Sequence, residues 1–167
     1  MQEAIQFQNS RGEQLAGVMH LPDAGEVRAC VLFAHCFTCT KNIKAAFNIA
    51  EALVGQGIGV LRFDFTGLGE SEGDFAQTHF SSNVQDLVDA AGFMARKYKA
   101  PEILVGHSLG GTAVLAAAHA IDSAVAIATI GAPADAEHVL HLLNDDLDTI
   151  AEQGEANVKL AGRPFKI

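Results

Sequence analysis

The chain has 167 residues, of which 49% are hydrophobic and 19% charged, so it can fold as one domain with a buried core and is not disordered. Its net charge of -9 and the lack of a lysine or arginine cluster exclude nucleic acid and anionic membrane surfaces as expected partners. The first residues lack the basic and apolar regions of a signal peptide, and the three cysteines are an odd number, so we expect a reduced, cytoplasmic protein.

The first half of the chain alternates between strand and helix patterns. Residues 3–8 and 14–21 alternate loosely and are separated by the turn-rich segment NSRGE, which predicts an antiparallel hairpin at a sheet edge. Residues 29–34, ACVLFA, are continuously apolar, as expected of a strand covered on both faces. Residues 43–54 then carry apolar side chains at helical spacing, and residues 58–63 repeat the buried-strand pattern.

The second half continues this rhythm. Residues 84–95 form a helical stripe, with a capping box predicted from Ser82 to the glutamine three residues on. Residues 103–105 and 124–130 are two further buried-type strands, and the small-residue run 112–120 between them predicts a closely packed helix. Strands and helices in this order imply right-handed crossovers and a doubly wound, mostly parallel α/β sheet.

The pattern weakens near the C-terminus. Residues 136–143 predict a short amphipathic helix, and residues 156–167 predict two short strands around a glycine. We therefore divide a single domain into a core, residues 1–133, and a cap-like or edge segment, residues 134–167.

The most informative stretch is LVGHSLGGT, residues 104–112, which places G-x-S-x-G between a predicted strand and a predicted helix. A serine on such a tight turn has a strained backbone, and Gly106, Gly110 and Gly111 let neighbouring chains approach closely. The turn also presents the hydroxyl at a helix N-terminus, which favours developing negative charge. Ser108 is therefore the candidate nucleophile.

Two other interpretations of this stretch are open. A G-x-S-x-G pattern arises by chance, so it does not by itself establish catalysis. Gly106 and Gly111 also have the spacing of a phosphate-binding loop, but Thr112 follows directly and the lysine of that motif is absent. Without that point charge for the phosphates, the phosphate-loop interpretation is disfavoured.

An acyl-transfer site needs two backbone N–H donors for the oxyanion. One is expected from Leu109, the residue after the nucleophile. The other is expected from the turn after the first buried strand, with Phe37 as first choice and Cys36 as second.

Three motifs in order resemble the α/β-hydrolase family: His35-Cys36-Phe37-Thr38, the loop DFTGLGES that starts at Asp64, and the serine elbow. More narrowly, HCFTCTKN, LRFDFTGLGESEG, GHSLGGTAVL and IGAPAD resemble the hydrolase part of bacterial proteins that join an α/β-hydrolase to an OsmC-like domain. The resemblance implies hydrolysis of carboxylic esters or related acyl bonds of a small-molecule substrate through a serine acyl-enzyme. It also implies no metal or organic cofactor, and a fused or separate OsmC-like domain as a partner.

The chain departs from the family in length. Only 59 residues (167 minus 108) follow Ser108, and they contain one clear buried strand, whereas the family places its acid and its histidine after further strands. Asp135 is a candidate acid at a strand end, but His138 lies only one helical turn away from it. We therefore expect a chain truncated before its last strands, with its general base beyond Ile167, weak or no activity alone, and an exposed hydrophobic sheet edge.

Two other classes of function compete with the hydrolase. Cys36 and Cys39 form a C-x-x-C after a strand, as in a thiol redox protein, whereas zinc binding by the pair lacks a second pair of ligands. A non-catalytic docking module is the third class, because the acid and base are missing. His35 and His107 are interpreted as packing and hydrogen-bonding residues. Cys36 also stands where most relatives have glycine, which bears on substrate size.

Overall fold

The computed structural model describes residues 1–36, 39–134, 147–154, 156–160 and 163–166. A six-stranded sheet forms the centre of the molecule, in the strand order β1-β2-β4-β3-β5-β6. Its strands are β1 (Gln2–Gln8), β2 (Gln14–His20), β3 (Ala29–Ala34), β4 (Ile58–Phe63), β5 (Ile103–His107) and β6 (Ala126–Ile130). The last four strands pair in parallel, and the hairpin β1-β2 joins β4 in antiparallel fashion, which confirms the predicted doubly wound, mostly parallel α/β sheet.

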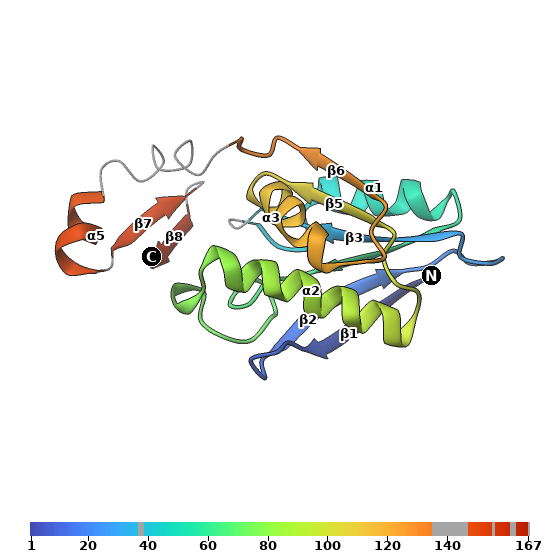
Figure 1. Ribbon diagram of the computed structural model, residues 1–167, viewed down its shortest axis with the longest axis horizontal. Helices are drawn as coiled ribbons and strands as arrows, with labels where there is room; N and C mark the ends of the chain where they lie inside the picture. The colour runs from blue at the N-terminus through green and yellow to red at the C-terminus, as the bar shows by residue number, and fades with distance from the viewer. Residues whose placement is uncertain (37–38, 135–146, 155, 161–162, 167) are drawn as a thin grey trace.

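Helices cover both faces of this sheet (Figure 1). They are α1 (Lys44–Val54), α2 (Phe80–Lys97) and α3 (Leu109–Ala117), and α3 continues into the short 3-10 helix η2 (Ala118–Ala120). Val31 and Phe33 of β3 pack in a cluster with Ala46 and Ala50 of α1, whereas the alternate residue Leu32 belongs to the cluster that contains α2 and α3. Side chains of a strand alternate between faces, so a continuously apolar strand serves two layers of helices.

The start of α2 differs from the prediction. The expected capping box between Ser82 and Gln85 is wrong, because the helix begins earlier, at Phe80. The His79 side chain accepts the backbone N–H of Ser82 at 3.2 Å, and the Ser82 hydroxyl side chain accepts the backbone N–H of His79 at 3.0 Å. A histidine replaces the usual serine, threonine or aspartate of the cap, which is why the pattern misplaced the first turn.

The exposure of β6 also differs from the prediction. Its apolar sequence predicted a strand buried on both faces, but all five of its residues are exposed. β6 hydrogen-bonds only with β5 in the described sheet and forms one of its two edges. The exposed side chains include Val125, Ile127 and Ile130, so the predicted hydrophobic sheet edge is present.

The C-terminal part contains α5 (Leu147–Gln153), β7 (Asn157–Leu160) and β8 (Arg163–Lys166). β7 and β8 form a separate antiparallel pair, as predicted for residues 156–167, while α5 was not expected. Figure 1 shows this part beyond the carboxyl ends of the parallel strands, and β8 contacts the 3-10 helix η1 (Phe75–Gln77). The predicted helix over residues 136–143 lies outside the described residues. Within the described part of the chain, no helix combines the length and apolar character needed to cross a bilayer.

Candidate active site

Ser108 stands between the end of β5 and the start of α3. It has φ 53° and ψ -127°, and it is the one non-glycine residue with positive φ in the described segments. Its backbone N–H donates to the Ile130 carbonyl at 2.8 Å, and its own carbonyl accepts the N–H of Gly111 at 2.8 Å. Such a conformation costs about 1–3 kcal/mol and persists only where the surroundings impose it. The half-buried Ser108 is thus held at the carboxyl edge of the sheet.

The glycines around Ser108 permit close contact between backbones. A Cβ on Gly106 would lie 2.4 Å from the Gly110 carbonyl oxygen, and one on Gly110 would lie 2.4 Å from the His35 carbonyl oxygen. A Cβ on Gly111 would lie 2.7 Å from the Ala132 Cβ. The first turn of α3 therefore abuts the end of β3, which brings Ser108 near the turn that starts at His35.

The predicted oxyanion donors are described in part. Leu109 is the first residue of α3, so its backbone N–H has no acceptor inside the helix. Phe37 lies outside the described residues, as does the candidate acid Asp135 with His138. Cys36 is described and buried, at the end of β3 beside the first turn of α3.

Asp64 organises the two loops near this edge of the sheet. Its fully buried carboxylate accepts the backbone N–H of Lys41 at 2.6 Å, the Lys41 ammonium at 2.6 Å and the backbone N–H of Glu70 at 3.0 Å. Gly69 has φ 56°, and a Cβ there would lie 2.2 Å from the carboxylate. The D-x-x-G-x-G-x-S motif is therefore a structural clamp in this chain.

The partner of Asp64 could not be recognised from the sequence. Lys41 is 97% shielded from solvent, and it contacts both Asp64 and Glu70. Burial lowers the pKa of Lys41, but the hydrogen bonds and charges of the two carboxylates outweigh burial and raise the pKa above its usual value. Lys41 thus stays charged and ties the turn after β3 to the Asp64 loop.

His35 is a structural residue of the same turn, as interpreted from the sequence. Its Nδ1 lies 2.6 Å from the Cys36 carbonyl oxygen, and its ring meets the Phe65 ring edge-on at 5.2 Å. Burial lowers the pKa of His35, so the neutral ring donates its Nδ1–H to that carbonyl. Its Nε2 faces Asp64 at 3.6 Å without a hydrogen bond.

Two features beside Ser108 were not foreseen together. Cys36 and Cys39 are joined by a disulfide, with Cα atoms 5.2 Å apart. Their sulfur atoms and a ring nitrogen of His107 all lie within 4.8 Å of one another. The sequence showed the cysteine pair, but the third group comes from β5, 68 residues further along the chain (107 minus 39).

Comparison with known proteins agrees with this fold. The family model described as serine aminopeptidase, S33 matches residues 25–154. The crystal structure of the esterase domain from a Rhodothermus marinus protein is 50% identical, with a TM-score of 0.76, and covers 100% of this chain and 64% of that chain. A serine hydrolase without lid from Xanthomonas campestris is 27% identical, with a TM-score of 0.66, over 76% of this chain and 60% of that one.

A curated relative is the mitochondrial palmitoyl-protein thioesterase ABHD10 of Rattus norvegicus. It is 35% identical over 101 residues, which are 60% of this chain and 33% of that protein. The chain thus matches about a third of the curated relative and less than two thirds of the Rhodothermus marinus structure. Because the family model matches most of the sequence, the chain belongs to the serine aminopeptidase, S33 family of α/β-hydrolases.

Proposed function

We propose that this chain carries the nucleophile of a serine hydrolase that cleaves carboxylic esters or related acyl bonds. The observation that carries the proposal is the backbone of Ser108, a non-glycine residue at φ 53° between close-packed glycines and the start of α3. A strained serine at this position fits an elbow that presents its hydroxyl to a substrate. The geometry has no evident purpose in a protein that only docks another domain.

The chemistry follows from these positions. The Ser108 oxygen attacks the acyl carbonyl and transfers its proton to a base, and the resulting oxyanion accepts N–H bonds from Leu109 and from Phe37 or Cys36. Collapse of this intermediate expels the alcohol or thiol, which takes up the proton and leaves an acyl-serine. Water then attacks the acyl-serine and releases the acid. The side chain of Cys36, in place of glycine, would narrow the acyl site.

The general base is assigned outside the chain. Within the described segments, the Ser108 hydroxyl has no hydrogen bond to a histidine, and His35 uses its Nδ1–H for the Cys36 carbonyl. We therefore place the base beyond Ile167 and keep Asp135 as the candidate acid. An unassisted serine hydroxyl is almost wholly protonated near neutral pH, so weak or absent activity is expected for these 167 residues alone.

The relatives support the acyl class. The Rhodothermus marinus neighbour is named as an esterase domain, and the rat relative is named as a palmitoyl-protein thioesterase. An oxoester or thioester of a small-molecule acyl group is thus the proposed substrate. A fused or separate OsmC-like partner domain and a cytoplasmic location rest on the sequence alone and remain predictions.

The thiol redox alternative has one observation in its favour, the Cys36–Cys39 disulfide. It explains neither the strained Ser108 nor the match to a hydrolase family. The hydrolase is therefore the preferred function.

A fluorophosphonate probe tests the proposal on two samples: this chain, and the same chain extended by its natural downstream sequence. We expect labelling at Ser108 and hydrolysis of short p-nitrophenyl esters by the extended protein, with both lost in Ser108→Ala. Ser81→Ala, which changes an exposed serine on α2, is the matched control and should leave both intact. Undiminished labelling in Ser108→Ala, or no ester turnover by the extended protein, would contradict the proposal.

A further inference from the structure

Three groups with an affinity for transition metals converge beside the elbow. Cys36 follows the end of β3, Cys39 lies three residues later, and His107 is the last residue of β5. β3 and β5 are neighbouring parallel strands, with Ala34 paired to Gly106, so their carboxyl ends bring these residues to the same edge. The two sulfur atoms and one His107 ring nitrogen lie within 4.8 Å of one another.

The His107 ring gives a second reason to expect a ligand. Its Nδ1 is buried, yet it has no hydrogen-bond partner within the described part of the chain. A buried polar atom without a partner costs about 1–3 kcal/mol, so native proteins rarely leave one unused. A metal ion bound at this nitrogen would satisfy it.

The local backbone also suits chelation. The backbone N–H of Cys39 donates to the Cys36 carbonyl at 2.9 Å, which closes a turn and holds the two Cα atoms 5.2 Å apart. His35 donates to the same carbonyl at 2.6 Å, so the start of the turn is fixed from both sides. Two thiolates on such a turn need to stand about 3.8 Å apart to share a tetrahedral zinc ion with bonds of about 2.3 Å. Rotation of the cysteine side chains supplies that change without moving the backbone.

We propose that reduced Cys36 and Cys39, together with His107 Nδ1, form a three-ligand site for a zinc-like divalent cation, and that the disulfide is the metal-free form of this site. Two sulfur ligands and one imidazole nitrogen select zinc, or cobalt as its substitute, over magnesium and calcium, which prefer oxygen. The fourth position of the tetrahedron is open to water or an added ligand. The missing second cysteine pair is thus replaced by one histidine from the neighbouring strand.

The chemical balance is simple. A dithiol reductant gives two electrons and two protons to the Cys36–Cys39 disulfide, which becomes two thiols, while the reductant becomes a disulfide. Binding of the divalent cation then displaces both thiol protons, and the neutral His107 ring donates its lone pair. Oxidation and metal binding therefore compete for the same two sulfur atoms.

Cobalt binding tests the site without any measurement of ester hydrolysis, so the result is independent of the hydrolase proposal. The 167-residue chain is reduced with a phosphine, freed of metal by a chelator and titrated with Co²⁺ without oxygen. We expect one ion per chain and a sulfur-to-cobalt charge-transfer band that Zn²⁺ removes by displacement. The band should vanish in Cys36→Ser and Cys39→Ser and in the oxidised chain.

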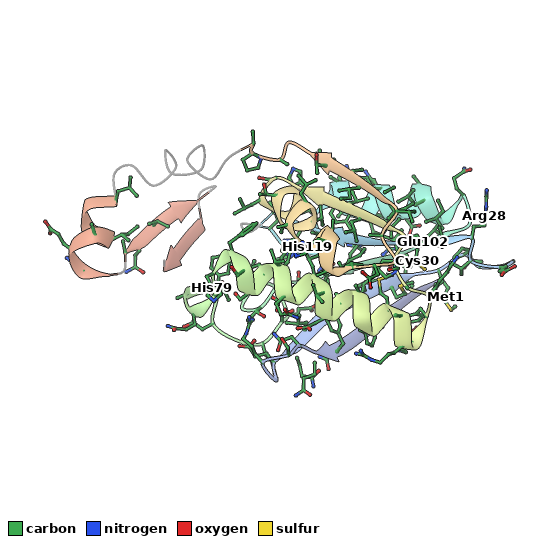
Figure 2. The ribbon with its side chains drawn as sticks, viewed as in Figure 1. Met1, Arg28, Cys30, His79, Glu102 and His119 are labelled. Carbon is green, nitrogen blue, oxygen red and sulfur yellow. A yellow bond between two sulfur atoms is a disulfide. The ribbon has the colours of Figure 1, made fainter. Side chains whose placement is uncertain are left out.

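His107→Asn separates a three-ligand site from a simple dithiol, and we expect it to weaken cobalt binding at least about tenfold. Two matched controls should bind as the unchanged protein does: His119→Asn, at an exposed histidine, and Cys30→Ala. Figure 2 shows Cys30 near Glu102, at the end of the sheet where the parallel strands begin. Burial raises the pKa of the Cys30 thiol, which keeps it unreactive.

A second measurement covers the case in which His107→Asn does not fold. In the reduced, unmodified chain, Zn²⁺ should slow alkylation of Cys36 and Cys39 and also slow acylation of His107 by diethyl pyrocarbonate, as located by mass spectrometry. No charge-transfer band in the reduced chain would overturn the proposal. Equal affinity in a folded His107→Asn, or His107 acylation unaffected by zinc, would equally overturn it.

Discussion

At the scale of single residues, Asp64 and Glu70 offer a direct comparison, because both contact the Lys41 ammonium. The Asp64 carboxylate is fully buried, whereas the Glu70 side chain is 72% exposed. Asp64→Asn leaves a buried ammonium without its buried counter-charge, which should lower the free energy of unfolding by about 3–5 kcal/mol. Glu70→Gln removes a solvent-screened charge and should cost less than about 1 kcal/mol. Urea denaturation measures both, and equal losses would show that Asp64 is not the clamp.

His20 is a residue whose protonation state is set by its neighbours. Its Nε2 accepts from the Arg62 guanidinium at 2.8 Å, so the ring proton sits on Nδ1, which donates to Glu51 at 2.9 Å. Burial lowers the pKa of His20, and the Arg62 charge lowers it further, against the raising effect of Glu51. A second proton would have to lie between the ring and the buried Arg62.

This arrangement predicts acid sensitivity. Below about pH 6.5 the unfolded chain binds a proton at His20 while the folded chain resists it, so the stability present above that pH is lost as pH falls. We expect the free energy of unfolding to decrease from about pH 7.5 to about pH 5.5 and the decrease to be smaller in His20→Gln. His35 adds a slope of the same sign, so the difference between the two proteins isolates His20. Identical urea-denaturation slopes in both would refute this assignment.

At the scale of elements, the contact between α3 and β3 depends on Gly110. A Cβ there would meet the backbone carbonyl oxygens of His35 and Ala34 at 2.4 and 2.6 Å, neither of which can rotate away. Gly110→Ala should therefore destabilise the fold by at least about 1–3 kcal/mol. The control is Gly92→Ala within α2, where the nearest atom is the flexible end of Arg96 at 3.3 Å.

The control should act in the opposite direction. Alanine in a helix interior is about 0.5–1 kcal/mol more favourable than glycine, so Gly92→Ala should raise the melting temperature while Gly110→Ala lowers it. Similar shifts in both variants would show that helix propensity, and not the close backbone approach, decides the effect at Gly110.

The elements themselves were largely predictable because their signals are local. The runs at residues 29–34 and 58–63 are continuously apolar, and β3 and β4 have those same bounds. The start of α2 was misplaced because its cap is a histidine. The burial of β6 was misjudged because the same apolar run suits a central strand and an edge strand, and only the strand order distinguishes them.

At the scale of the whole molecule, the β6 edge should promote self-association. Its backbone groups on one side are unpaired within the described sheet, and Val125, Ile127 and Ile130 are exposed beside them. An apolar open edge is a template for another strand. Light scattering should detect association that increases with concentration and is reduced in Ile127→Lys.

A control variant distinguishes the edge from general surface hydrophobicity. Leu115 on α3 is 53% exposed and lies away from the edge strand, so Leu115→Lys should leave association unchanged. A chain that stays monomeric at all concentrations, or that responds equally to both lysine substitutions, would contradict the role of the edge.

By itself, the sequence determined the succession of strands and helices, the mostly parallel sheet and the position of the candidate nucleophile. These depend on short-range periodicity and on a contiguous motif, LVGHSLGGT. Only the tertiary structure decided that Lys41 neutralises Asp64, that Arg62 keeps His20 neutral and that His107 completes the cysteine pair. These partners are 23 to 71 residues apart (64 minus 41; 107 minus 36), and they meet because of the order in which the parallel strands lie side by side. That order is a property of the folded sheet, which no local pattern encodes.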